Sequence, residues 1–202
     1  MKTESILRIL ESLYSKRDSF TKEELDRVTT LIINRIDYDG NFLSVDFKDL
    51  DSFDNIEVLT IDGCMLDCFV MEKIINHSNF KKVVFRNCDV VEDVYDYFRK
   101  LNTEELAFIN SNIDLTKVSG IYYRVYLETM KIGCLDSSGE ILDVSHCEIE
   151  EIDDVLTSFF NTIVLSSRQY NAYEDVIKTS NKRIVIMKDN GQFVDKEVRL
   201  DG

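Results

Sequence analysis

Residues 55–66 read NIEVLTIDGCML, and residues 79–90 read NFKKVVFRNCDV. Each stretch has an apolar residue, further apolar residues three and five positions after it, a cysteine eight positions after it and another apolar residue ten positions after it. The first copy begins at Ile56 and the second at Phe80, 24 residues later. A pattern that recurs at a nearly constant spacing predicts a stack of similar structural units.

Further copies of the pattern lie on both sides of these two. They begin at positions 28, 103, 139, 160 and 181, which makes seven copies. The spacing is irregular between positions 103 and 139, where RVYLETMKIGCL can be read as an extra copy that uses Leu127 and Thr129. Leu127 would then lie only 15 residues before Leu142, the matching residue of the next copy. We therefore expect an abbreviated turn without a helix. A loop insertion is expected at residues 37–45.

This pattern resembles the leucine-rich repeat, L-x-x-L-x-L-x-x-N/C-x-L, over roughly residues 21–191. The lead-in SFTKEELDRVTTLIIN is similar to the helical start of bacterial leucine-rich repeat domains, and Thr21 with Glu24 forms a capping-box pattern. The resemblance implies a parallel strand on the inner, concave side of each turn and a helix or extended segment on the outer side.

The chemistry of a strand explains the apolar positions. Residues two apart, such as Leu59 and Ile61, point to the same face of a strand and are expected in a core shared with neighbouring turns. In the family that the chain resembles, the Asn or Cys position turns inward after the strand and bonds backbone groups at the bend. Cys64, Cys88 and Cys147 occupy that position, and Ser111 does so once.

The segments outside the strands carry helical patterns. Apolar spacing predicts helices at residues 91–101, at 148–160 with Phe159 on the apolar face, and near 173–180. A helix at residues 4–14 could cover the first repeat with four apolar side chains, Ile6, Leu10, Leu13 and Tyr14. Asn190-Gly191 predicts a closing hairpin.

These elements predict an α/β fold: a leucine-rich repeat solenoid with a parallel concave β-sheet and a helical or irregular convex side. We expect a single domain over residues 1–202. It comprises a helical cap at 1–20, seven to eight irregular repeats at 21–186, and a C-terminal hairpin cap and tail at 187–202.

The net charge of −14 argues against direct nucleic-acid binding, because such binding requires Lys and Arg against phosphates. A protein partner with a basic surface is the better electrostatic match, although the charge could simply maintain solubility. The N-terminal residues lack the apolar centre of a signal peptide, and no apolar run approaches the length of a membrane span. We therefore expect a cytoplasmic protein with reduced thiols and no membrane association.

Reactive residues are few. The run DVSHCE at 143–148 places Ser145, His146 and Cys147 together, but a nucleophile and its base usually meet through the fold rather than as neighbours. Cys64, Cys68 and His77 match no closed zinc pattern. No phosphate-binding glycine loop is present. We expect no enzyme activity, no cofactor and no metal.

The acidic run at residues 148–154 has two readings. It could be a docking surface, or its carboxylates could favour the positive end of a helix dipole. The solvent-facing strand positions are more informative, because several are apolar. The expected central row is Thr60, Val84, Ala107, Asp143, Val164 and Val185, and the next row is Asp62, Arg86, Ile109, Ser145, Ser166 and Met187.

An apolar exposed sheet favours a binding surface, although β-branched residues suit strands anywhere. We therefore predict a non-catalytic protein-binding scaffold or adaptor that uses the concave sheet. The partner-binding candidates are Asp62, Val84, Arg86, Ile109, Asp143, Ser145 and Met187. One alternative is an acidic inhibitor that blocks a basic nucleic-acid-binding enzyme, as a phage or immunity protein might. Another is a hydrolase centred on DVSHCE.

Overall fold

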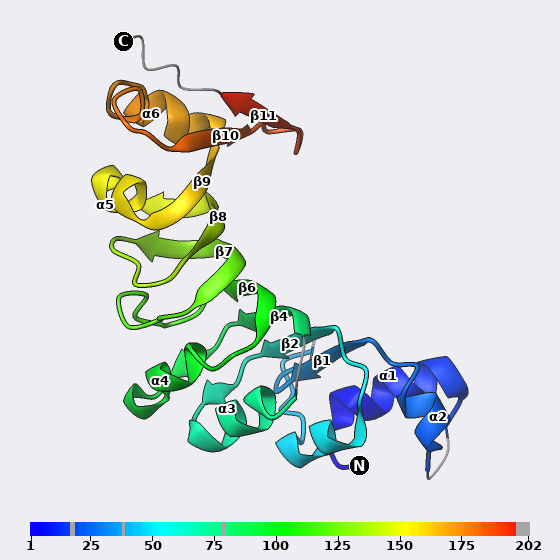
Figure 1. Cartoon of the computed structure of the whole chain (residues 1–202). Helices are drawn as coiled ribbons and strands as arrows, with labels where there is room; N and C mark the ends of the chain where they lie inside the picture. Colours follow the sequence, from blue (N-terminus) through cyan, green and yellow to red (C-terminus); the bar gives the residue numbers. More distant parts are fainter. Residues whose placement is uncertain (17–18, 38, 78–79, 197–202) are drawn as a thin grey trace. The chain divides into compact units, whose positions relative to one another are not determined.

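A large, mostly parallel sheet of nine strands dominates the mixed α/β fold, and a second sheet has two short strands. The computed structural model describes residues 1–16, 19–37, 39–77 and 80–196. The chain divides into two compact units, which Figure 1 shows in blue to green and in green to red. The first unit comprises residues 1–103 and 111–113, and the second comprises residues 104–110 and 114 onward.

Three parallel strands form the sheet of the first unit. They are β1 (Thr30–Asn34), β2 (Val58–Asp62) and β4 (Phe80–Arg86), in that order. Leu31 pairs with Leu59, which pairs with Val83. All three side chains are fully buried. The positions that match between the sequence copies therefore lie opposite one another, because burial of one apolar face selects a single strand register.

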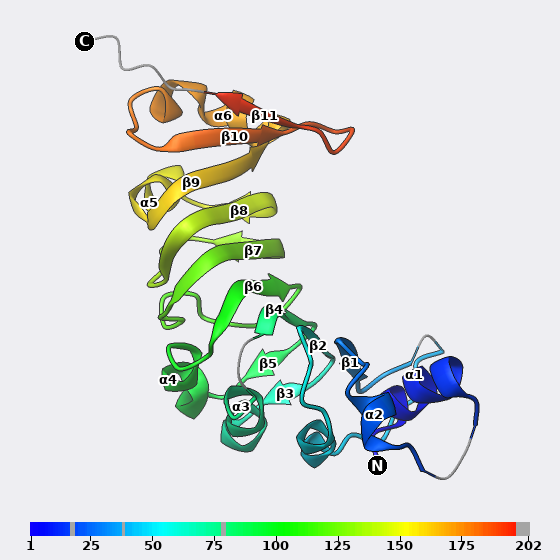
Figure 2. The ribbon, with the colours of Figure 1, turned by 45° about the vertical axis from the view of Figure 1, so that its right-hand side comes forward.

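Short helices and strands precede and follow the sheet strands of the first unit. These elements are α1 (Glu4–Tyr14), α2 (Lys22–Leu25), η1 (Phe47–Ser52), β3 (Met65–Leu66), α3 (Cys68–Ile75), β5 (Asp89–Val90), η2 (Glu92–Val94) and α4 (Tyr95–Phe98). Figure 2 shows the short sheet of β3 and β5 beside α3. The capping box of Thr21 and Glu24 is confirmed at α2. The sequence patterns missed α3, which begins where Asp67 accepts a hydrogen bond from the Val70 amide at 2.9 Å.

The chain bends sharply at or near the ends of several strands of the large sheet. Gly63, Asn87, Asn110 and Thr129 all have positive φ, between 47° and 68°. A single left-handed residue turns the chain sharply, and glycine and asparagine tolerate this conformation best. The next residue turns inward: the Cys88 thiol donates to the Arg86 carbonyl, with 3.2 Å between the two atoms. The cysteines after Gly63 and Asn87 thus bond backbone carbonyls at their bends, as expected.

Ser111 performs the same role within the first unit. Its hydroxyl donates to the Phe85 carbonyl oxygen at 3.1 Å and accepts from the Cys88 amide at 3.1 Å. Ser111 therefore connects the backbone at the end of one strand to the bend that follows it.

Six strands form the sheet of the second unit. In spatial order they are β6 (Thr103–Ile109), β7 (Ile121–Ile132), β8 (Ser138–Ile149), β9 (Phe159–Ser166), β10 (Arg183–Met187) and β11 (Phe193–Lys196). The pairs from β6 to β10 are parallel, whereas β11 is antiparallel to β10. Helix α5 (Ile152–Thr157) precedes β9 and α6 (Ser167–Ile177) follows it. Residues 110–120 and 133–137 contain no helix, so the turns before and after β7 are abbreviated.

The register predicted for β7 is wrong. The sequence reading used Leu127 and Thr129 as the strand pair, but Leu106 pairs with Val125 and Phe108 pairs with Leu127. Val125 and Leu127 are buried, and Thr129 is the exposed left-handed residue. Methionine replaces the expected cysteine or asparagine at position 130 of this copy, which concealed the pattern.

Two apolar side chains are also misplaced by the sequence patterns. Phe159 begins β9 and is 73% exposed, so it does not belong to the apolar face of α5. Leu13 of α1 is 59% exposed, whereas Ile6 and Leu10 are fully buried. Leu13 lies in the last turn of the helix, which ends at Tyr14.

The hairpin predicted at Asn190-Gly191 is confirmed as β10 and β11. Residues 197–202 of the predicted C-terminal tail lie outside the described residues. Among the helices of the described chain, none combines the length and apolar character needed to cross a membrane.

Replacement of Phe85 by alanine should destabilise the first unit strongly, because its ring is fully buried and meets Phe98 edge-on at 5.9 Å. We expect a loss of about 3–5 kcal/mol in the free energy of unfolding, measured by guanidinium denaturation. Phe42→Ala is the control, because Phe42 is 79% exposed in the same unit. Equal losses for both variants would contradict this assignment of the core.

Candidate binding face

One face of the second unit's sheet is built from alternate residues of neighbouring strands. Strand register aligns Arg124 with Ile141, Thr162 and Arg183 in one row. The adjoining row is Tyr126, Asp143, Val164, Val185 and Asp195. Directly opposite residues point to the same side of a sheet, so these two rows share one face. We call this set of residues, together with Met187 and Phe193, the binding face.

A buried ion pair lies at the centre of the binding face. Arg124 Nη2 donates to Asp143 Oδ2 at 2.5 Å, and the Asp143 side chain is only 2% exposed. Ser145 Oγ donates to the other carboxylate oxygen, Oδ1, at 2.7 Å. These bonds compensate the carboxylate for its removal from water. They also hold the partly exposed guanidinium of Arg124 in one orientation.

Tyr126 is held from the opposite side. Its hydroxyl donates to Glu128 Oε2 at 2.6 Å, and its ring centroid lies 5.8 Å from the Arg124 guanidinium carbon. Burial, reinforced by the hydrogen bond to Glu128, raises the pKa of the Tyr126 phenol above its usual value. The phenol therefore stays protonated at neutral pH and remains a donor. Arg124 and Tyr126 are thus fixed side by side before any partner arrives.

A groove of about 280 Å³ adjoins this pair. Its floor is partly apolar, and its rim carries two exposed aromatic rings, Tyr123 at 59% and Phe193 at 56%. The lining residues are Tyr123, Arg124, Glu140, Ile141, Thr162, Val164, Arg183, Val185 and Phe193. A groove of this size accommodates one or two side chains of a partner rather than a large ligand.

Arg124 also has an unsatisfied donor. Its Nε atom is buried and has no hydrogen-bond acceptor in the part of the chain that the structure describes. Buried polar groups almost always have a partner, so an exception invites an explanation.

The predicted partner-binding residues fall in both units. Asp62 and Arg86 pair across β2 and β4 in the first unit, with 3.9 Å between Asp62 Oδ2 and Arg86 Nη1. In the second unit, the Ser145 hydroxyl oxygen lies 3.6 Å from Met187 Sδ. Ile109 is half-buried and pairs with Glu128. Arg86 is exposed, and Asp62 and Met187 are partly exposed.

The expectation that all seven candidates face solvent is wrong for three of them. Val84, Asp143 and Ser145 are 6%, 1% and 6% exposed, respectively. They do occupy the predicted strand positions, but their side chains are covered; over Asp143 the covering group is the Arg124 guanidinium. These three residues can support a surface but can offer a partner little direct contact.

Sequence reasoning missed three residues of the binding face, Arg124, Tyr126 and Phe193. Arg124 and Tyr126 were overlooked because the misread register of β7 removed that strand from the predicted rows. Phe193 was overlooked because the hairpin was considered only as an end cap. A copy placed with Val125 and Leu127 in its two core strand positions would have aligned Tyr126 with Ala107 and Asp143.

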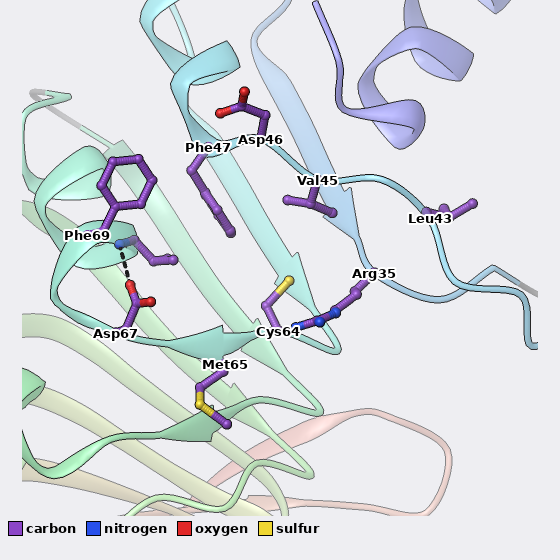
Figure 3. Close-up of a pocket in the computed structure, with 10 residues that line it drawn as sticks. Arg35, Leu43, Val45, Asp46, Phe47, Cys64, Met65, Asp67 and Phe69 are labelled. Atoms are coloured by element: carbon purple, nitrogen blue, oxygen red, sulfur yellow. Dashed lines mark hydrogen bonds between the residues drawn. The ribbon is translucent and has the colours of Figure 1, made fainter.

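A larger pocket, about 500 Å³, lies in the first unit beside Cys64 and Arg35 (Figure 3). Its polar groups already have structural roles: Asp67 accepts from the Val70 amide, and Asp46 accepts from the Lys48 amide at 3.1 Å. Burial raises the pKa of the Cys64 thiol to about 11, which outweighs the opposite effect of Arg35. The pocket therefore lacks an activated nucleophile at its cysteine.

The run DVSHCE is likewise absorbed by the fold. The Ser145 hydroxyl binds Asp143, and burial raises the pKa of the Cys147 thiol to about 12. His146 is exposed, and its ring meets that of Tyr126 at 6.3 Å. Within the described residues, no group of three or more His, Cys, Asp or Glu side chains is placed to hold a metal ion.

The sequence has no match among models of known protein families or among curated proteins.

The cysteines should differ sharply in reactivity toward a thiol reagent at pH 8. Burial raises the pKa of Cys88 to about 12, so about one thiol in ten thousand is ionised, and the side chain is inaccessible. We expect rapid modification of the exposed Cys134 and none of Cys88 until the protein unfolds. Mass mapping of the modified peptides measures this order. Early modification of Cys88 would contradict its placement.

Asp143→Ala should destabilise the second unit more than Asp195→Ala does. The first change leaves Arg124 without its buried partner, whereas the Arg183–Asp195 pair is exposed. We expect losses in the free energy of unfolding of about 2 kcal/mol and below 1 kcal/mol, respectively, measured by urea denaturation. The double variant R124M/D143L should recover most of the loss. Similar losses for the two single variants would contradict a buried pair.

Proposed function

We propose that this protein is a leucine-rich-repeat-type solenoid that acts as a non-catalytic binding scaffold for a protein partner. Parallel strands in register, sharp left-handed bends and inward-turned cysteines support the repeat assignment. Such repeats expose one continuous strand face, which repeat proteins commonly use for binding.

The observation that carries the proposal is the preorganised pair of Arg124 and Tyr126 beside an apolar groove. Arginine and tyrosine are enriched among the residues that dominate protein interfaces, especially where they are held rigidly in place. Here Asp143 and Glu128 provide that rigidity. Phe193 and Tyr123 add exposed aromatic area at the rim. The binding face thus combines rigid polar anchors with apolar surface, as interface cores do.

The first candidate partner is a protein with a basic surface. The net charge of −14 attracts such a partner at long range, while the binding face supplies the specific contacts. A second candidate function is inhibition of a basic nucleic-acid-binding enzyme, which the same charge favours. Inhibition predicts binding that weakens steeply with salt and is displaced by DNA or RNA, whereas recognition by the groove depends less on salt.

Tyr126→Ala should weaken partner binding by about 2 kcal/mol, or roughly thirtyfold, because it removes a rigid anchor from the binding face. The tagged chain is first used to purify partners from its native cell, with mass spectrometry, and the isolated partner is then titrated calorimetrically. Arg168→Ala is the control, since Arg168 is exposed at the start of α6 and belongs to neither row. Arg86→Glu tests whether the first unit also contributes to partner binding.

Equal loss for Tyr126→Ala and Arg168→Ala, or capture that is insensitive to both, would contradict the binding face. Displacement of the captured partner by DNA would instead favour the inhibitor.

A further inference from the structure

The hairpin at the end of the second unit leaves a specific set of backbone groups without a strand partner. Its loop spans Asp189 to Gly191, and the Lys188 amide donates to the Gln192 carbonyl oxygen at 2.8 Å. Gly191 has a φ of +76°, the left-handed residue that closes such three-residue loops. Lys188 and Gln192 are therefore a hydrogen-bonded pair, which sets the alternation along the two strands.

In an antiparallel pair, hydrogen-bonded and non-hydrogen-bonded residue pairs alternate. Val194, opposite Ile186, therefore directs its amide and carbonyl toward β10. Phe193 and Asp195, opposite Met187 and Val185, direct theirs away from β10. In the described chain β11 is the last strand of the sheet, so no strand receives these four groups.

The edge strand of the first unit, β1, differs from β11 because a helix covers part of its edge. There the Asn34 amide of β1 donates to the Ser5 hydroxyl of α1 at 3.2 Å, and Ser5 is buried. Exposed sheet edges are normally covered in this way, or blunted by proline, a bulge, charged side chains or a short edge strand, because they template pairing with another chain. No proline occurs in the sequence, and an exposed Phe193 lies on the edge of β11. The shortness of β11 and the charge of Asp195 limit such pairing, but within the described residues the outward amides and carbonyls of β11 remain open.

An extended peptide fits this edge best. Donors and acceptors on alternate residues match an extended backbone and no other common conformation. Phe193 also lines the groove, so a strand added beside β11 would place alternate side chains next to it on the binding face. Two copies of this chain, each with a net charge of −14, repel one another, whereas a positively charged partner is attracted.

We propose that β11 receives an extended segment of a positively charged partner as an added strand, aligned by the outward amides and carbonyls of Phe193 and Asp195. This proposal rests on the proposed protein-binding function and specifies how the partner's backbone is held.

The test uses a displayed library of random 12-residue peptides selected on the immobilised full chain. The tightest peptide is titrated calorimetrically against the wild-type chain, Asp195→Pro and Asp195→Ala. Proline removes the outward amide without removing a hydrogen bond to β10, and alanine matches the loss of the carboxylate. We expect Asp195→Pro to bind about tenfold more weakly than Asp195→Ala, the effect of roughly one lost backbone hydrogen bond.

A second series of titrations changes the peptide and leaves the protein unchanged. It therefore tests strand addition even if Asp195→Pro disturbs the hairpin. Each peptide amide is methylated in turn. Strand addition predicts that binding falls at every second position of the paired stretch, because only alternate amides face β11. Amide hydrogen exchange at Phe193 and Asp195 should slow when the peptide binds.

Uniform tolerance of N-methylation, with equal binding by the proline and alanine variants, would overturn strand addition. The proposed function would stand in that case if Tyr126→Ala still abolished capture of the native partner. Failure to select any peptide would also overturn strand addition without deciding the capture experiment. Protection of the Phe193 amide that depends on protein concentration alone would show a second copy at this edge, which would overturn the assignment to a partner.

Discussion

Both units depend on one constraint. The apolar residues at alternate positions of a strand must stack on the matching apolar residues of the next strand. Leu31, Leu59 and Val83 do so in the first unit, and Val125, Leu142 and Ile163 do so in the second. A slip of one residue would move this whole set of side chains to the opposite face. The resulting register aligns the outward residues as well, so the rows of the binding face are a consequence of core packing.

The bends that end the strands satisfy a second requirement. A parallel strand must be followed by a return segment, and the turn leaves backbone groups without partners in the sheet. The left-handed residues and the cysteine or serine after them satisfy those groups locally, as Cys88 and Ser111 show. The cysteines are thus explained by packing and hydrogen bonding, and the raised pKa values of Cys64 and Cys88 follow from the same burial.

The binding face differs from the core in the way that its charges are held. Asp143 is more deeply buried than most carboxylates, yet its partner Arg124 remains partly accessible. This arrangement converts a long, mobile side chain into a rigid one at the surface. Rigid polar anchors lose little conformational entropy on binding, which gives a physical reason for placing a buried carboxylate under an arginine. The open edge of β11 adds backbone groups that are equally fixed before binding.

The sequence by itself determined the strand positions, the small polar residues at the bends and the closing hairpin, because each depends on local spacing or local turn chemistry. Only the tertiary structure decided the register of β7, where Met130 replaces the expected bend residue and neighbouring strands choose the pairing. It also decided that Val84 and Asp143 are covered while Tyr123 and Phe193 are exposed. Exposure depends on which side chains of other strands lie above a residue, and no pattern within one segment contains that information.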